Sequence, residues 1–536
     1  MKVADALAAT LKSYGARWAF GIPGNDVLET VRACEEAGIG FVLGKSEPSC
    51  AFMADAVYQL TGKPSVLIPA LGPGISNAMS GIAGAMQERS AVAVLCGEMA
   101  SKQMGIYNHQ VFDHVALARP VTKYAENLNP RRAAQQLAKA LDIALAYPAG
   151  PVFLNVPSDY NRDLAVVEEV RVPSRRAVTA LANESASKLR ARIAAAKNPL
   201  VLAGRGALIG ETPKAFAKFI EAWKLPFFTT YKAKGIVSES HALCLGSVGL
   251  SPVVDTQNLA LLKEADCLVL VGFDPIELRD AWLDAWPDSL PVVSIDWAAL
   301  NHRIFPVGEE ALGDVPTILG QLLPESAAKN AWKPERFASL REKVAHIVRP
   351  RTPAKGISPA ALFHAVSAQA KDDWIMTVDV GAHRILANHV VQCRVPGQLM
   401  QSNGLGCMGY AVPAAIAAQL VHPERPVVAM LGDGCMLMTQ GELALAAERE
   451  LPLVVVVLND AALALIKLKQ SKMNMSPRAT DFKSPDFAKI AEGFGAKGVR
   501  VDTIEAFGKA LAEAVKARRF TLIDAQVDPA EYWEQM

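Results

Sequence analysis

The chain has 536 residues, and since one hydrophobic core serves about 100–200 residues, this length favours three domains. Its formal net charge of +1 argues against a nucleic acid or an anionic membrane as a partner. Hydrophobic residues make up 51% of the chain and charged residues 20%, a balance typical of well-packed α/β proteins.

The eight cysteines are scattered and none forms a C-x-x-C pair, so neither a zinc site nor a redox dithiol is expected. Single cysteines of this kind suit a reducing compartment. The first residues run directly into an amphipathic helix without an apolar leader, and no apolar run reaches the length of a membrane span. We therefore expect a cytoplasmic protein without a membrane partner.

Residues 1–165 alternate helical and strand patterns and form the first predicted domain. Its predicted helices are Ala4–Tyr14, Pro48–Leu60 and Ile75–Met86. Its predicted strands are Trp18–Gly21, Gly40–Leu43, Ser65–Ile68, Ala91–Cys96 and Val152–Val156. Helices that alternate with strands apolar on both faces indicate a parallel sheet.

Two further α/β units follow, at residues 186–330 and 358–536, after charged or proline-containing stretches at 160–185 and 325–357 that we interpret as linkers. The predicted strands of the second unit are Pro199–Leu202, Pro226–Thr229, Cys267–Val271 and Pro291–Ile295. Those of the third are Ile375–Val378, Val427–Leu431, Leu453–Leu458 and Thr521–Val527. The sequence therefore predicts an α/β fold of three domains, each with a mainly parallel sheet flanked by helices.

The most informative motif is Gly432-Asp433-Gly434, which follows the apolar strand Val427–Leu431 and precedes a second strand that ends near Asp460. Glycines let the backbone approach a diphosphate closely, with N–H groups free to donate. The two aspartates offer hard oxygen ligands, and Mg²⁺ characteristically binds one or two carboxylates together with phosphate oxygens. The pattern indicates a phosphate-and-metal site; the simpler interpretation is a strand-turn-helix with a capping aspartate.

This motif, followed about thirty residues later by Asn459-Asp460, resembles the signature of enzymes that use thiamine diphosphate (ThDP). Other segments match that family in chain order: Glu47–Pro64, Leu71–Asn77, Arg119–Lys123, Gly404–Gly409 and Asp524–Pro529. Segments typical of the FAD-independent, catabolic type of acetolactate synthase are Phe20–Gly24, His109-Gln110 and Gly272–Glu277. The chain is most similar to the group of acetolactate synthases and 2-oxo-acid decarboxylases.

The resemblance implies a pyrimidine-binding domain (1–165), a central domain (186–330) and a diphosphate-binding domain (358–536). It also implies roles for three catalytic residues. Glu47 would hydrogen-bond N1′ of the aminopyrimidine, although a glutamate in the first turn of a helix also stabilises the helix dipole. Gln110 would lie near C2 of the thiazolium ring. His109 would shuttle protons near neutral pH, or would simply form hydrogen bonds within a loop.

For the cofactor, the resemblance implies contacts from Gly381, Ala382, His383, Gly406, Met408, Gly432, Gly434, Cys435 and Leu463. Met408 would bend ThDP so that its two rings approach each other, whereas the alternative is an ordinary core methionine. The family often has glutamine where this chain has Ala382, and His383 would equally suit a helix cap. Asp433, Asp460 and the backbone carbonyl of Ala462 would bind Mg²⁺.

For the substrate, the resemblance implies contacts from Gly24, Asn25, Leu465, Ile466 and Lys469. Lys469 stands where acetohydroxyacid synthases have an aromatic residue, so it would attract a substrate carboxylate or would be solvated.

Two departures from the family concern histidine. Ser46 precedes Glu47 where acetolactate synthases usually have histidine, and Asp113-His114 offers one imidazole where pyruvate decarboxylases have an adjacent pair. These departures indicate an unusual substrate.

The predicted function is ThDP- and Mg²⁺-dependent decarboxylation of a 2-oxo acid followed by carboligation to a second carbonyl compound, with pyruvate to 2-acetolactate as the leading reaction. Two alternatives are a simple decarboxylase that releases an aldehyde and a non-catalytic nucleotide-binding protein. A dinucleotide oxidoreductase is not favoured, because no G-x-G-x-x-G follows the first strand.

In this family the activating glutamate and the metal site reach one cofactor from different subunits, so the resemblance implies a homodimer or homotetramer. The turn Gly204–Ala207 would suit FAD or ADP, but it lacks the acidic and arginine-rich pattern of FAD-binding relatives. FAD is therefore not expected.

Overall fold

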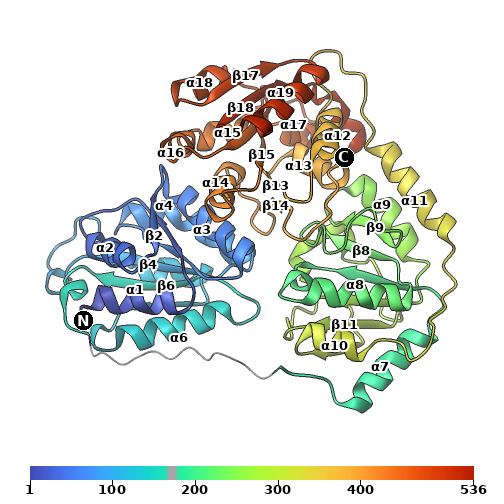
Figure 1. Ribbon diagram of the computed structural model, residues 1–536, viewed down its shortest axis with the longest axis horizontal. Coiled ribbons are helices and arrows are strands. Elements are labelled where there is room, and N and C mark those ends of the chain that lie inside the picture. Colours follow the sequence, from blue (N-terminus) through green and yellow to red (C-terminus); the bar gives the residue numbers. More distant parts are fainter. Residues whose placement is uncertain (166–177) are drawn as a thin grey trace.

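A computed structural model describes residues 1–165 and 178–536, which contain three six-stranded parallel sheets, each flanked by helices (Figure 1). The predicted fold class is confirmed.

The first sheet lies within residues 1–165. Its strands are β1 (Trp18–Gly21), β2 (Gly40–Leu43), β3 (Ser65–Leu67), β4 (Val92–Glu98), β5 (Tyr124–Asn127) and β6 (Val152–Pro157). Its helices are α1 (Val3–Ser13), α2 (Leu28–Glu36), α3 (Glu47–Thr61), α4 (Pro73–Gln87), α5 (His114–Ala118) and α6 (Ala133–Leu145). The strand order is β2-β1-β3-β4-β6-β5.

The central sheet has the order β12-β11-β10-β7-β8-β9. Its strands are β7 (Pro199–Ala203), β8 (Phe227–Thr230), β9 (Cys244–Val248), β10 (Cys267–Val271), β11 (Val292–Asp296) and β12 (Glu309–Leu312). Its helices are α7 (Asn183–Ala195), α8 (Thr212–Trp223), α9 (Pro252–Leu262) and α10 (Val315–Gln321).

The third sheet has the order β14-β13-β15-β16-β18-β17. Its strands are β13 (Ile375–Val378), β14 (Leu399–Gln401), β15 (Val427–Gly432), β16 (Leu453–Asn459), β17 (Lys497–Val501) and β18 (Thr521–Gln526). Its helices are α12 (Pro359–Gln369), α13 (Ala382–Val390), α14 (Ala411–Val421), α15 (Asp433–Thr439), α16 (Glu442–Glu448), α17 (Ala464–Lys472), α18 (Phe487–Gly493), α19 (Ile504–Ala517) and α20 (Tyr532–Gln535).

The interpretation of residues 325–357 as a linker was wrong, because they contain a fourteen-residue helix, α11 (Pro334–Ile347). Phe337 and Leu340 lie on one face of this helix and are buried with side chains of the central domain. Pro334 is compatible with the helix because proline fits its first turn. Of the other predicted linker, residues 166–177 lie outside the described residues.

Five strands were not predicted: β5, β9, β12, β14 and β17. Each is at an edge of its sheet.

The first and third domains share one apolar core. Helix α3 packs against α14, and the rings of Phe52 and Tyr410 meet edge to face with their centroids 5.8 Å apart. Helix α3 is held between the first sheet and the third domain, so any residue at its start has a fixed place relative to both. In the two described ranges, no helix combines the length and apolar character that crossing a membrane requires.

Candidate active site

A cavity of about 120 Å³ lies at the carboxyl end of the third sheet, where segments after β13, β15 and β16 meet. Strand β13 has β14 on one side and β15 on the other. From β13 the chain continues to one edge of the sheet, and from β15 it continues toward the opposite edge. Such a switch point is where open parallel sheets bind ligands.

Many predicted site residues line this one cavity. They are Gly381, Ala382, His383, Met408, Gly432, Asp433, Gly434, Cys435, Asp460, Ala462, Leu463, Leu465 and Ile466. Four further lining residues were not predicted: Val380, Leu458, Ala464 and Tyr532. Tyr532 comes from α20, at the far end of the domain sequence, and no motif marks it.

Two carboxylates face this cavity. The carboxylate of Asp433 is buried and accepts the backbone N–H of Gly434 at 2.7 Å and that of Ala461 at 2.7 Å. Burial raises the pKa of Asp433 to about 6. Burial, with the nearby charge of Asp433, raises the pKa of Asp460 to about 8. Two acids that disfavour each other's charge are suited to a shared cation, which would stabilise both ionised forms.

The turn between β16 and α17 is strained at Ala461, whose φ of 56° lies in the left-handed region that non-glycine residues seldom adopt. The strain is compensated at least in part, because the Ala461 N–H donates to Asp433 and the Ala462 N–H donates to Asp460 at 3.1 Å. The two carboxylates and this turn therefore hold one another in place.

His383 offers a buried polar atom at the cavity. Its Nε2 has no hydrogen-bond partner among the described residues, and burial lowers its pKa to about 3, so the imidazole is neutral. A Cβ atom at Gly381 would lie 2.5 Å from the ring, and one at Gly432 would lie 3.2 Å from it. The glycines therefore make room for the ring at the cavity.

The carboxylate of Asp379 positions the segment that carries Met408. It accepts the backbone N–H groups of Gly409 and Ala411, both at 3.0 Å. Asp379 is fully buried after β13, and sequence reasoning missed it, because a carboxylate at a strand end has no distinctive pattern. A Cβ atom at Gly434 would lie 2.9 Å from a Leu463 methyl carbon and 3.5 Å from the Met408 methyl carbon, so the glycine makes room chiefly for Leu463.

The remaining predicted residues do not line this cavity. Gly406 is half-buried in a turn with φ of 69°, and Lys469 is exposed on α17. Five others lie in the first domain, at the carboxyl end of its sheet: Gly24, Asn25, Glu47, His109 and Gln110. Within one chain, the predicted residues thus form two separate groups.

Glu47 opens helix α3, is half-buried, and accepts the Asn77 side-chain N–H at 3.4 Å. Gln110 and His109 lie in an exposed segment after β4. Gln110 lies against Gly72, where a Cβ atom would come within 2.8 Å of the Gln110 Cβ. Gly24 lies near Ala70, so this group gathers around the turn that precedes α4.

His114, the single imidazole noted in the sequence, is buried. Its Nδ1 lies 3.1 Å from a carboxylate oxygen of Glu98, and its Nε2 accepts the Gly72 N–H at 3.2 Å. It therefore holds the Gly72 turn rather than facing a substrate.

Within residues 1–165 and 178–536, no group of three or more histidine, cysteine, aspartate or glutamate side chains is arranged to hold a metal ion by itself. A pair of carboxylates beside room for phosphate oxygens is a different kind of site, and it is the kind that Mg²⁺ uses. Together with the unpartnered His383 nitrogen, this donor set fits a magnesium-bound diphosphate.

Comparison with known proteins identifies the family. Three family models of thiamine pyrophosphate enzymes match this chain: the N-terminal TPP binding domain at residues 1–117, the central domain at 186–322 and the C-terminal TPP binding domain at 379–525. The acetolactate synthase of Bacillus subtilis (strain 168) is 30% identical over 98% of this chain and 93% of its own length. The chain belongs to the thiamine pyrophosphate enzyme family.

Other relatives of this thiamine pyrophosphate enzyme cover it as fully. The acetolactate synthase isozyme 1 large subunit of Escherichia coli (strain K12) is 29% identical over 98% of this chain and 94% of its own length. The probable acetolactate synthase large subunit of Methanocaldococcus jannaschii is 28% identical over 99% of this chain and 93% of its own length. Thiamine pyrophosphate is ThDP, so the predicted membership in the ThDP family is confirmed.

Proposed function

We propose that this ThDP enzyme uses Mg²⁺, decarboxylates a 2-oxo acid and joins the remaining acyl fragment to a second carbonyl compound, with pyruvate to 2-acetolactate as the leading reaction. The observation that carries the cofactor assignment is the cavity lined by two carboxylates at the β13–β15 switch point. The carboligation step is supported by near-full-length similarity to proteins named acetolactate synthases.

At the diphosphate end, Asp433 and Asp460 would bind Mg²⁺ with the backbone carbonyl of Ala462. Neutral His383 would lie against the diphosphate, since its ring lines the cavity and its Nε2 has no hydrogen-bond partner among the described residues. Around them, the ligand would contact the remaining cavity residues, Gly381, Ala382, Gly432, Gly434, Cys435 and Leu463. Gly406 would contribute through the turn that leads to Met408.

When bound, ThDP supplies a nucleophilic carbon, C2 of its thiazolium ring, and accepts the electrons that loss of CO₂ releases. Met408 would orient the two rings by contact, because its side chain lines the cavity beside Gly434. The Glu47 carboxyl group would share a proton with N1′ of the aminopyrimidine. Gln110 and His109 would act near C2, and Gly24, Asn25, Leu465, Ile466 and Lys469 would contact the substrate.

We propose that the active enzyme is at least a homodimer, in which Glu47 of one subunit serves the cavity of the other. Glu47 does not line the cavity of its own chain, which supports this arrangement. The domain roles follow: pyrimidine binding by residues 1–165, a central domain at 186–330 and diphosphate binding by 358–536. A cytoplasmic location is supported by the eight cysteines, all of which are free.

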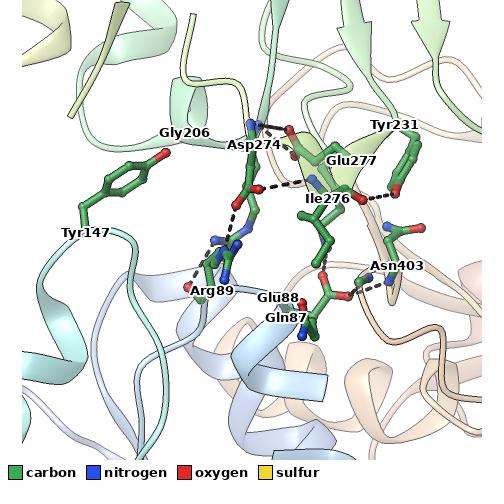
Figure 2. A pocket seen from close by; sticks show the side chains of 13 residues that line it. Gln87, Glu88, Arg89, Tyr147, Gly206, Tyr231, Asp274, Ile276, Glu277 and Asn403 are labelled. Atoms are coloured by element: carbon green, nitrogen blue, oxygen red, sulfur yellow. Dashed lines mark hydrogen bonds and ion pairs between the residues drawn. The ribbon is translucent and has the colours of Figure 1, made fainter. Parts of the chain in front are cut away.

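We propose that the central domain holds no FAD. In the Gly204–Ala207 turn, the Arg205 N–H donates to both carboxylate oxygens of Glu277, at 3.0 and 3.2 Å, so an internal acid occupies the donor that a phosphate would need. Glu277 and Asp274 lie together beside Arg89 in Figure 2. A cavity of about 490 Å³ adjoins this turn, so space is available. The argument against FAD is instead that Glu277 already accepts the Arg205 N–H. Flavin absorbance near 450 nm in the purified protein would contradict this proposal.

The reaction is tested by proton NMR of the purified protein with ThDP, Mg²⁺ and pyruvate. Acetolactate or acetoin would support the carboligase, and acetaldehyde alone would support a simple decarboxylase. If ThDP binds but pyruvate is unchanged, the leading substrate is wrong and other 2-oxo acids follow in the same assay. Failure to bind ThDP would contradict the proposed function.

A further inference from the structure

The carboxylate of Glu442 in the third domain holds the backbone that leads into Glu47 in the first domain. One of its oxygens, Oε1, accepts the backbone N–H of Lys45 and that of Ser46, both at 3.0 Å. Glu442 is 1% exposed, although it bridges two domains. Hydrogen bonds from N–H groups to a carboxylate are charge-assisted and roughly twice as strong as neutral ones.

This contact lies directly before helix α3, which has no side-chain cap. Ser46 is the N-cap residue, and its hydroxyl donates to the Ser49 hydroxyl at 2.8 Å instead of capping the helix. The N–H groups before the first turn are thus satisfied by an acid from α16. A negative charge at the start of a helix also stabilises its dipole.

We propose that Glu442 is a positioning residue for Glu47. By fixing the two peptide units that precede Glu47, its carboxylate sets the direction in which the Glu47 side chain leaves the end of β2. This inference rests on the proposed role of Glu47 at the aminopyrimidine. Asp433 is the first residue of α15, the helix immediately before α16. One continuous segment of the chain therefore carries the proposed metal-binding aspartate and holds the backbone before the proposed activating glutamate of the same chain.

Two other contacts join α16 to this segment, and they provide a control. Glu448 pairs with the Lys45 side chain at 2.8 Å, but its own side chain is 56% exposed. The guanidinium group of Arg449, the residue after α16, donates to the Phe41 carbonyl at 3.0 Å in an exposed position. Exposed pairs contribute little, so Glu448→Gln removes one negative charge from the same helix without releasing the backbone before Glu47.

The test measures exchange of the ThDP C2 proton for deuterium in the holoenzyme, by quenched-flow proton NMR, because this rate reports what Glu47 does. We expect Glu442→Ala to slow exchange by about tenfold to a hundredfold, since misplacing a catalytic group by about 1 Å costs on that order. Its ThDP affinity should change by less than about twofold, because the diphosphate residues are untouched. Glu442→Gln keeps one acceptor oxygen and should recover most of the rate, and Glu448→Gln should match the wild type.

Wild-type exchange in a folded Glu442→Ala holoenzyme would overturn the inference. Loss of exchange in parallel with loss of ThDP binding would also overturn it, since that result would mean a merely structural role. If Glu442→Ala does not fold, Glu442→Asp retracts the same carboxylate by one methylene group and is judged by the same two readouts. Wild-type exchange in Glu47→Gln would instead contradict the proposed function itself, so the two failures are distinguishable.

Discussion

The first and third sheets have the same strand order. In each, the second strand lies at one edge and is followed by the first, third, fourth, sixth and fifth strands. The shared order brings corresponding turns to the carboxyl end of each sheet. Topology therefore determines where polar side chains can gather, and the residues at those turns determine the chemistry.

The residues at corresponding turns differ. After the third strand, the helix begins at Asp433 in the third domain and at Pro73 in the first. After the fourth strand, the third domain has Asp460, while the first ends in Glu98, whose carboxylate is bonded to His114 and Asn155. At these turns the third domain therefore has two carboxylates that line one cavity, and the first domain offers Glu47 after its edge strand β2.

The largest expected effect is on the third sheet. Asp433→Ala should abolish Mg²⁺-dependent ThDP binding and lower turnover by at least about a thousandfold, because it removes one of two carboxylates proposed to bind the ion. Calorimetric titration of ThDP with and without Mg²⁺ measures the loss. Asp502→Ala, which removes an exposed aspartate of the same domain, is the control. Full Mg²⁺-dependent binding of ThDP by Asp433→Ala would contradict the proposal that the metal site belongs to the third domain.

The first sheet should contribute to the reaction rather than to binding. Glu47→Gln should leave ThDP affinity within about threefold of wild type while turnover falls by about a hundredfold or more, the usual contribution of a positioned acid–base group. Steady-state kinetics with ThDP titration separates the two quantities. Equal turnover in both forms would show that Glu47 has no catalytic role.

Mixing these two variants tests whether the sheets meet across subunits. In a hybrid dimer of Glu47→Gln and Asp433→Ala chains, one site would combine an intact Glu47 with an intact Asp433. Random pairing makes half of the dimers hybrid, each with one of two sites restored, so about a quarter of the wild-type activity should return. Activity no greater than that of the separate variants would place each site within one chain or require another assembly.

The strands that the sequence failed to predict share a position at an edge of a sheet. The inner strands are buried on both faces and read as continuous apolar runs, such as Leu453–Asn459. Three edge strands have exposed positions and no such run: β5 reads Tyr-Ala-Glu-Asn, β12 reads Glu-Glu-Ala-Leu and β17 reads Lys-Gly-Val-Arg-Val. The edge strands β9 and β14 are mostly buried, and β14 has only three residues. Hydrophobic periodicity therefore finds the middle of a parallel sheet and misses its edges, with β2 as the exception.

The candidate site divides in a similar way. Residues within a motif, such as Asp433 and Asp460, could be predicted because their spacing along the chain is fixed by one strand-helix-strand unit. Asp379, Glu442 and Tyr532 could not, because their importance comes from contacts with segments distant in sequence. Such contacts follow from the packing of domains, which no local pattern encodes.

A smaller effect is expected where a side chain contributes only shape. Met408→Ala should lower turnover by about tenfold, since the ring-orienting contact is lost, while ThDP affinity changes by less than about threefold. Met408→Leu keeps an apolar side chain of similar volume and should stay within about threefold of the wild type. The turnover numbers of Met408→Ala and Met408→Leu at saturating ThDP, each divided by that of the wild type, are the measurement. Identical rates in all three proteins would make Met408 an ordinary core residue.

The smallest effect concerns Asp26, a buried acid at the carboxyl end of the first sheet. Asp26 accepts the Leu71 N–H at 2.8 Å, and burial raises its pKa above the ordinary value. A carboxyl group whose pKa is raised by folding stabilises the protein below its unfolded pKa, and this contribution is lost as the pH rises through the folded value. Asp26→Asn should therefore weaken the fall in thermal stability as the pH rises from about 4. Because Asp26 does not line the cavity, turnover at neutral pH should stay within about twofold of wild type. Melting temperatures of both proteins across this pH range are the measurement, and the same pH dependence in both proteins would contradict the prediction.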